Sequence, residues 1–227
     1  MIATRKVGAE RLDELPPQDP GARGSRRDLG RINSLTRHPA LLAELIGSRP
    51  IARLLDLGAG DGALLLKVAR RVPKAGPVHA VLLDQHDLLP EASRAAFARM
   101  GWRAEPVVAD AFEYLAREQE PFDVVLTNHF LHHWPDPRLA ELLALISARA
   151  RMLVACEPFR ARSALAGSRL LWAIGCNGVT RYDARVSILA GFRKTELSAL
   201  WPGQAGWSFT ERDVPPFSHV FRAERAS

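Results

Sequence analysis

A short stretch rich in glycine and carboxylates has the composition of a ligand-binding loop. Residues 56–62 read DLGAGDG and follow a run of apolar residues. Glycine at positions 58, 60 and 62 permits a tight turn and lets a ligand approach the backbone closely. A helix that begins directly after such a turn directs its positive N-terminus at the same ligand. The pattern therefore predicts a binding loop between a strand and a helix.

The charge of this loop separates two kinds of ligand. Gly58, Gly60 and Ala63 satisfy the dinucleotide pattern Gly-x-Gly-x-x-Gly/Ala, so a nucleotide-dependent oxidoreductase is one interpretation. A pyrophosphate is an anion, however, and Asp56 and Asp61 place carboxylates around it. Carboxylates favour a cationic ligand with an ammonium and a sulfonium group, such as S-adenosylmethionine. The loop therefore favours that ligand over a dinucleotide.

Two further carboxylates follow the next two apolar runs. Asp84 ends the second run, where its two oxygens can accept hydrogen bonds from both hydroxyls of a ribose. Asp87 is close enough in the sequence to take that role instead. Asp110 ends the third run. Because the carboxyl ends of parallel strands meet at one edge of a sheet, we expect these acids to lie beside the glycine loop.

A pair of histidines follows the fourth apolar run. Residues 127–137 read TNHFLHHWPDP and include His132 and His133. The ordinary pKa of imidazole is near neutrality, so either residue could remove a proton from a substrate. A structural role for both is the alternative, and Glu157 is a further candidate base. Neither a carboxylate nor a thiol lies at metal-ligand spacing from the pair, so no metal site is expected.

The elements that position these residues alternate along the chain. Uninterrupted apolar runs indicate buried strands, and apolar residues at helical spacing indicate amphipathic helices. The expected strands span residues 52–57, 78–83, 104–108, 122–126 and 151–155, and the expected helices span residues 63–72, 90–100, 112–117 and 138–148. This alternation predicts an α/β fold with a doubly wound parallel sheet, covered by helices on both faces.

The N-terminal part of the chain departs from this alternation. Residues 1–25 are rich in proline, glycine and charge and are expected to form a flexible arm. Residues 26–50 are expected to form two cap helices separated at Pro39, with Asp28 capping the first. We expect residues 26–227 to form a single domain.

The C-terminal part shows mixed signals. Residues 157–191 are expected to cover the substrate, although residues 175–191 have no clear period. Residues 163–174 and 192–200 have a helical pattern, whereas 207–212 and 219–223 alternate like strands. These last two runs predict that the sheet closes with a hairpin edge in which a C-terminal strand is antiparallel.

The motifs together resemble class I S-adenosylmethionine-dependent methyltransferases from about residue 53 to 155. DLGAGDG resembles their motif I, and residues 131–136 resemble a segment of small-molecule members that modify quinones and polyketides. The resemblance implies a Rossmann-like fold, S-adenosyl-L-methionine as cofactor and S-adenosyl-L-homocysteine as product. The cofactor-binding residues that it implies are Asp56, Gly58, Gly60, Gly62, Asp84, Gln85, Asp110, Ala111, Phe112 and Asn128.

Within that set, Asp110, Ala111 and Phe112 are expected at the adenine, although Phe112 could instead be a core residue. His133 and His132 are the expected catalytic residues, with His133 preferred. The expected reaction is O-methylation of a phenolic or polyketide-type small molecule, and C-methylation of a quinol or aromatic compound is the alternative. A methyltransferase-like binding protein without turnover is a further alternative.

Composition narrows the partners and the location. The 227 residues carry a formal net charge of +6, yet no dense basic run is present. Residues 128–131 also lack the Pro-Pro of amino-methylating DNA enzymes, so nucleic-acid substrates are disfavoured. No signal peptide and no apolar run of about 20 residues is found, which predicts a cytoplasmic protein. The two cysteines, Cys156 and Cys176, predict no disulfide framework, and the oligomeric state stays open.

Overall fold

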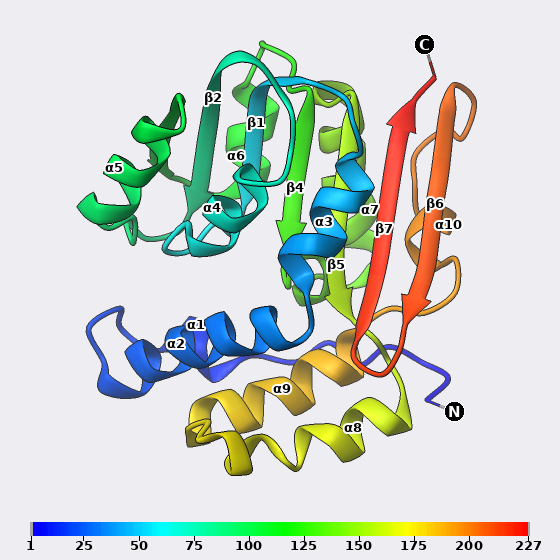
Figure 1. Ribbon diagram of the computed structural model, residues 1–227. Helices are drawn as coiled ribbons and strands as arrows, with labels where there is room; N and C mark the ends of the chain where they lie inside the picture. Colours follow the sequence, from blue (N-terminus) through cyan, green and yellow to red (C-terminus); the bar gives the residue numbers. More distant parts are fainter. Residues whose placement is uncertain (1, 227) are drawn as a thin grey trace.

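The computed structural model describes residues 2–226, which are built around a seven-stranded sheet (Figure 1). The strands are β1 (Ile51–Leu57), β2 (Lys74–Asp84), β3 (Trp102–Val108), β4 (Val124–Asn128), β5 (Met152–Pro158), β6 (Trp207–Val214) and β7 (Ser218–Arg225). Their order in the sheet is β3-β2-β1-β4-β5-β7-β6. Strands β1 to β5 are parallel, and β7 runs antiparallel to both of its neighbours. The predicted fold class and its antiparallel hairpin are confirmed, and within the hairpin β6 is the outermost strand.

The register of the sheet brings the functional loops to one level. Leu57 at the end of β1 pairs with Leu83 of β2 and with Thr127 of β4. On the far side of β2, Asp84 pairs with Val108 of β3. The carboxyl ends of these four strands therefore form one continuous edge, where ligands bind in open α/β sheets.

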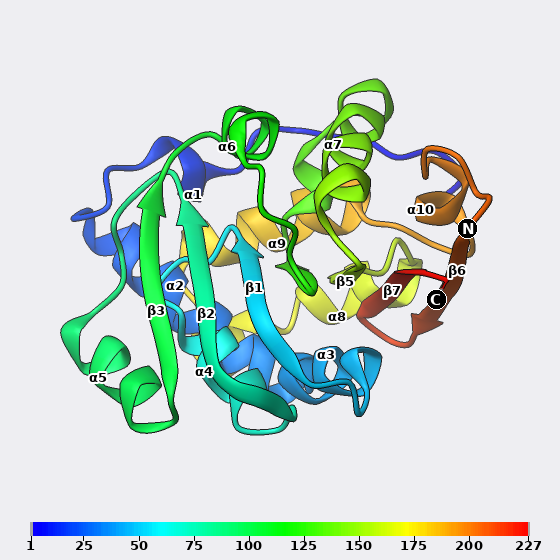
Figure 2. The same cartoon turned by 90° about the horizontal axis from the view of Figure 1, so that it is seen from above.

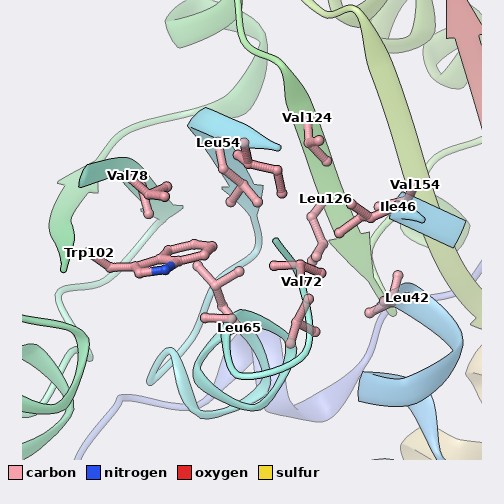
Figure 3. Packing of buried hydrophobic residues seen from close by; sticks show 14 of the residues in the cluster. Leu42, Ile46, Leu54, Leu65, Val72, Val78, Trp102, Val124, Leu126 and Val154 are labelled. Atoms are coloured by element: carbon pink, nitrogen blue, oxygen red, sulfur yellow. The ribbon is translucent and has the colours of Figure 1, made fainter. Parts of the chain in front are cut away.

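Helices cover both faces of the sheet (Figure 2). One face carries α3 (His38–Ile46), α4 (Ala63–Ala69) and α5 (Glu91–Arg99), and the other carries α6 (Ala111–Arg117), α7 (Asp136–Arg149) and α10 (Glu196–Ala199). Figure 3 shows the core under α3 and α4, where Leu42 and Leu65 point toward Leu126 and Trp102. Burial on both faces explains why β1 and β4 are mainly apolar rather than alternating.

Four further helices lie beneath the carboxyl edge of the sheet, and we call them the cover layer. They are α1 (Arg11–Glu14), α2 (Pro20–Leu35), α8 (Arg162–Ser168) and α9 (Gly178–Ala190), and a 3₁₀ turn over Leu171–Ile174 joins the last two. Figure 1 shows that this layer combines the N-terminal segment with residues that follow β5. No helix among residues 2–226 is both long and apolar enough to cross a membrane.

The N-terminal segment differs from the flexible arm that composition predicts. Arg5 donates to the backbone oxygens of Ala190 and Trp134, at 2.8 and 3.1 Å. Helix α2 begins at Pro20 because the Asp19 side chain accepts hydrogen bonds from its first free N–H groups. Asp28, predicted as the cap, is instead buried within this helix. Polar contacts to distant parts of the chain hold the segment, so its low apolar content misled the prediction.

Helix α9 lies where no periodicity was visible. Asn177 caps its first turn by accepting a hydrogen bond from the Thr180 N–H at 2.9 Å. Its buried face includes Thr180, Asp183 and Ser187, which recur at helical spacing but are polar. Hydrophobic periodicity fails for such a helix because its inward side chains make hydrogen bonds instead of apolar contacts. The helix predicted over residues 192–200 is also shorter, since α10 spans only Glu196–Ala199.

Candidate functional site

A cavity of about 930 Å³ lies between the carboxyl edge of the sheet and the cover layer. This volume is at the upper end of the range for small-molecule sites. The sheet contributes the loops after β1, β2, β3 and β4, whereas the cover layer contributes α2, α8 and α9 together with residues 7–13. The predicted site residues that line the cavity are Asp56, Gly58, Gly60, Asp84, Gln85, Asp110, Ala111, Asn128 and His133.

The glycine loop follows β1 and leads into α4, as predicted. Gly58 and Gly60 have φ values of +72° and +55°, a conformation that favours glycine. A Cβ atom on Gly58 would also lie 2.8 Å from the Phe130 ring, so this residue has no room for a side chain. Gly62 begins the helix and faces the apolar side chains of Leu82 and Leu89 rather than the cavity. Its role is therefore to let the loop pack against the core.

Two carboxylates flank this loop in different environments. Asp84 Oδ2 accepts a hydrogen bond from the Gly60 N–H at 2.9 Å, and Oδ1 accepts one from the His86 N–H at 3.1 Å. Asp56 is only 2% exposed. Burial, aided by the negative charge of Asp84, raises the pKa of Asp56 well above its usual range. A positive group placed beside Asp56 would therefore favour the ionised form.

The residues after β3 divide between the cavity and the core. Asp110 Oδ1 caps α6 by accepting from the N–H groups of Phe112 and Glu113, at 2.8 and 3.0 Å. Among the described residues Oδ2 has no such partner, so it can accept a hydrogen bond from a ligand. The Phe112 ring packs edge-on against Trp134 and under the Arg138 guanidinium. It does not line the cavity, which corresponds to the core role considered as its alternative.

His132 is buried between two carboxylates. Its Nδ1 lies 2.7 Å from Glu157 Oε2, and its Nε2 lies 3.1 Å from Glu10 Oε1. Burial alone would lower the pKa of His132, but the hydrogen bonds to Glu10 and Glu157 outweigh it and raise the value to about 9. Hydrogen bonding to His132 likewise overcomes burial at both glutamates and lowers the pKa of each to about 2. His132 does not line the cavity, because Glu10 covers it.

His133 and His129 reach the cavity from the same loop. Nε2 of His133 lies 3.2 Å from the backbone oxygen of His129, and Nδ1 lies 3.1 Å from Asp13 Oδ2. His129 has a φ of +54°, and its buried Nε2 has no hydrogen-bond partner among the described residues. Burial, with the charge of His132 adding to it, lowers the pKa of His129 to about 4. At neutral pH this imidazole is uncharged and free to bond a ligand.

Asn128 joins the sheet to two helices. Its Oδ1 accepts a hydrogen bond from His38 Nδ1 at 2.9 Å, and its amide lies 3.4 Å from Asn33 of α2. His38 Nε2 in turn accepts from the Ser218 hydroxyl at 2.8 Å. Burial and the nearby His129 lower the pKa of His38 to about 3, so this side chain is a neutral bridge.

Sequence reasoning missed several residues that complete the site. Glu10 and Asp13 fall in the segment that was interpreted as a flexible arm, and His38 falls in a helix interpreted only as a cap. His129 lies in the same motif as His132 and His133, but the motif alone does not mark it as a site residue. Nothing in the local sequence marks Glu10, which meets His132 across a separation of 122 residues.

Comparison with known proteins supports the same fold. Residues 54–151 match the family described as "Methyltransferase domain". Over 76 residues the chain is 33% identical to the tRNA1(Val) (adenine(37)-N6)-methyltransferase of Pasteurella multocida, covering 34% of this chain and 32% of that protein. Over 95 residues it is 34% identical to the phenazine O-methyltransferase PhzM of Lysobacter antibioticus, covering 41% of this chain and 26% of that protein. The matched region thus spans well under half of each curated relative.

A solved structure extends the likeness to nearly the whole chain. The plantazolicin methyltransferase BamL, solved with a triazolic desmethylPZN analogue and S-adenosylhomocysteine, superposes with a TM-score of 0.64 at 13% identity. The superposition covers 95% of this chain and 93% of that one. At this identity the likeness establishes the fold, including the cover layer as part of it. Residues 54–151 thus match a methyltransferase domain, and nearly the whole chain shares its fold with a solved methyltransferase.

Proposed function

We propose that this chain, which carries a methyltransferase domain on the class I fold, transfers the methyl group of S-adenosyl-L-methionine to a small molecule. Three carboxylates around the glycine loop carry the proposal, namely Asp56, Asp84 and Asp110. They lie at the carboxyl ends of β1, β2 and β3, which the sheet register brings side by side. A cationic cofactor suits such a surrounding, whereas a pyrophosphate does not. We call this half of the cavity wall the cofactor side.

On the proposed assignment each carboxylate has a separate task. Asp84 accepts from the ribose hydroxyls, and the free oxygen of Asp110 accepts from the adenine amino group beside Ala111. Asp56 faces the ammonium end, where a positive charge offsets the cost of ionising a buried acid. Gln85 lies next to Asp84 on the wall and completes the ribose contacts.

The opposite half of the wall, formed by the histidines and the cover layer, is the proposed acceptor side. Toward the mouth it is lined by apolar residues of α2, the segment after α8 and the β6–β7 turn, namely Leu35, Leu170, Leu171, Ile174 and Phe217. Such a lining supports an acceptor with an apolar body, and the nearby imidazoles support a hydroxyl as the methylated group. These features favour O-methylation of a phenolic or polyketide-type molecule.

We assign the general base to His133. Its Nε2–H donates to the His129 carbonyl, so Nδ1 is the nitrogen that can take up a proton, and Asp13, 3.1 Å away on the cavity wall, would stabilise the resulting positive charge. His132 has both ring nitrogens engaged with carboxylates and serves to position the loop. The reaction itself needs mainly the alignment of the acceptor oxygen with the sulfonium methyl group. A cytoplasmic location stays a prediction from the sequence.

Calorimetry with S-adenosylhomocysteine tests this function. We expect a dissociation constant in the micromolar range or tighter, roughly −8 kcal/mol. Replacing Asp84 with alanine should weaken binding by about 1.5–3 kcal/mol, because a charge-assisted pair of hydrogen bonds is lost. Asp87→Ala is the matched control and should bind normally, because Asp87 does not line the cavity. Binding of a nicotinamide dinucleotide in place of S-adenosylhomocysteine would overturn the proposal.

A further inference from the structure

The surroundings of His132 contain one more hydrogen-bond acceptor than a neutral imidazole can satisfy. Glu157 Oε2 lies 2.7 Å from Nδ1, and Glu10 Oε1 lies 3.1 Å from Nε2. A neutral imidazole carries a single N–H group, so one of these contacts lacks a hydrogen. The side chain of His132 is 2% exposed, and water has little access to compensate. Either a second proton or another positive charge must complete the arrangement.

The same imbalance occurs at His133. The backbone oxygen of His129 lies 3.2 Å from Nε2, and Asp13 Oδ2 lies 3.1 Å from Nδ1. When the single N–H points at the carbonyl, the lone pair of Nδ1 faces a carboxylate. Across the two histidines, four oxygens therefore face four ring nitrogens that carry two hydrogens when neutral. This surplus of oxygen atoms over N–H groups makes the cluster a place where a cation can bind.

The dimensions of the cluster suit a cation. One ring nitrogen from each histidine and one oxygen of Glu10 all lie within 4.8 Å of one another. With metal–ligand bonds of about 2.0–2.2 Å, neighbouring ligand atoms are roughly 3–4 Å apart. The Glu10–His132 separation of 3.1 Å already falls at that spacing. Asp13 Oδ2 lies 3.1 Å from Nδ1 of His133, a second pair at that spacing.

Both histidines are also anchored on the side away from the cluster. A metal-binding histidine usually donates its second ring N–H to a carboxylate or a backbone carbonyl, which fixes its tautomer and orientation. Glu157 supplies that acceptor for His132, and the His129 carbonyl supplies it for His133. Glu157 is itself fixed by two backbone N–H groups of the same loop, both at 3.0 Å from Oε1.

We propose that Nε2 of His132, Nδ1 of His133 and the carboxylate of Glu10 bind one divalent first-row transition cation, with Asp13 as a fourth ligand. Two imidazoles with carboxylates suit Zn²⁺, Mn²⁺, Fe²⁺ or Co²⁺ better than Mg²⁺ or Ca²⁺. His133, Glu10 and Asp13 line the cavity, so the remaining coordination positions open toward a bound substrate. The spacing argument against a metal could not detect this set, because Glu10 and His132 are 122 residues apart.

The cation would change how the acceptor is activated. A hydroxyl oxygen bound to a divalent cation loses its proton more readily, so the cation replaces the imidazole as the activating group. This consequence rests on the proposed methyl transfer, whereas cation binding itself does not. The two can therefore be tested separately.

Titration of the untagged, chelator-treated full chain with Co²⁺ tests the site directly. We expect one Co²⁺ per chain, visible as absorption bands of the coordinated ion, and loss of those bands when Zn²⁺ is added. Glu10→Gln and His133→Gln should each weaken Co²⁺ binding by more than the roughly 10–100-fold typical of outer anchors, because each removes a ligand. Glu157→Gln should weaken Co²⁺ binding only by about 10–100-fold, since it removes an outer anchor and not a ligand.

His79→Gln is the matched control, because His79 forms a similar pair with Glu105 at 2.8 Å but does not line the cavity. Its Co²⁺ binding should equal that of the unchanged chain. Absence of saturable binding at one equivalent, or binding that both Glu10→Gln and His133→Gln retain, overturns the proposal. S-adenosylhomocysteine binding is measured on the same samples. If it persists while Co²⁺ fails to bind, only the cation site is wrong.

Discussion

The cofactor side and the acceptor side of the cavity are held together in different ways. On the cofactor side Asp110 bonds the N–H of a residue two positions away, and Asp84 bonds Gly60 on the neighbouring strand end. On the acceptor side His132 meets Glu10 across 122 residues, and Asp28 of α2 accepts from the Asn177 N–H across 149. Local turns build the first wall, whereas the second exists only when distant segments have come together.

This difference separates the two tasks that we propose for the cavity. The cofactor side is part of the hydrophobic core, since the strands that end there are buried on both faces. The acceptor side rests on buried ionised groups and on helices that are docked by polar contacts. Changes on one side should therefore leave the other side intact, and the predictions below test that independence in order of expected effect.

The largest effect is expected at the acceptor side, on turnover. In the chelator-treated chain, where no cation can take over the activation, replacing His133 with alanine should lower methyl transfer by roughly 10²–10⁴-fold, the usual contribution of a general base. Affinity for S-adenosylhomocysteine should stay the same, because His133 belongs to the other wall. Single-turnover kinetics and calorimetry measure the two quantities. Full turnover in this variant would mean that His133 is structural and that activation occurs elsewhere, such as at His129.

The next effect concerns stability. Glu157→Gln removes the closer of the two carboxylates that hold the buried His132 and leaves only Glu10, which should cost about 1.5–3 kcal/mol of unfolding free energy. Asp84→Asn is the counterpart on the cofactor side. The amide oxygen keeps one of the two backbone N–H groups and water can reach the other at this 21% exposed side chain, so the change should cost less than about 1.5 kcal/mol. Urea unfolding measures both. Equal losses would show that the two walls depend on charge to the same degree.

A comparable effect should appear in the pH dependence of stability. The pKa of His38 is about 3 in the folded chain and near 6.5 when unfolded, so only the unfolded chain gains a proton as the pH falls below 6.5. At pH 4.5 this should reduce the stability by about 2–3 kcal/mol relative to neutral pH.

His38→Gln should remove that part of the slope, because the amide can replace both hydrogen bonds without titrating. Unfolding curves at pH 7 and pH 4.5 provide the comparison. A slope unaltered by His38→Gln would refute the neutral bridge between Asn128 and Ser218.

The smallest effect is a proton released on the cofactor side. Because burial raises the pKa of Asp56 well above its usual range, a ligand ammonium that favours the ionised carboxylate should expel up to about one proton. Binding enthalpies measured in buffers of different ionisation enthalpy should then differ for the unchanged chain and agree for Asp56→Asn. Release of the same number of protons from both chains would assign the proton to another group.

The independence of the two sides also explains which features the sequence reveals. The order of strands and helices from β1 to β5 could be predicted, because apolar runs and glycine turns are local signals. The same holds for the glycine loop and for Asp84 and Asp110, which lie within a few residues of a strand end. Gly62 and Phe112 were assigned to the cofactor, yet both face the core.

The acceptor side could be predicted only in part. The adjacent pair His132 and His133 is visible in the sequence. Their carboxylate partners, Glu10, Asp13 and Glu157, carry no local signal that links them to the pair. Helix α9 was missed because its buried face is polar, and the segment before α2 was missed because it is held by single hydrogen bonds. Such contacts depend on three-dimensional closure, which propensity and periodicity do not encode.

The position of β7 has a consequence for how the chain is made. β7 lies between β5 and β6, yet it follows β6 in the chain. During synthesis from the N-terminus, β6 therefore has no strand to pair with until β7 emerges from the ribosome. Until then β5 also keeps an unpaired edge. An unpaired edge readily joins a strand of another chain. A nascent chain stalled after residue 214 should thus aggregate or recruit chaperones, even though the five parallel strands are already complete.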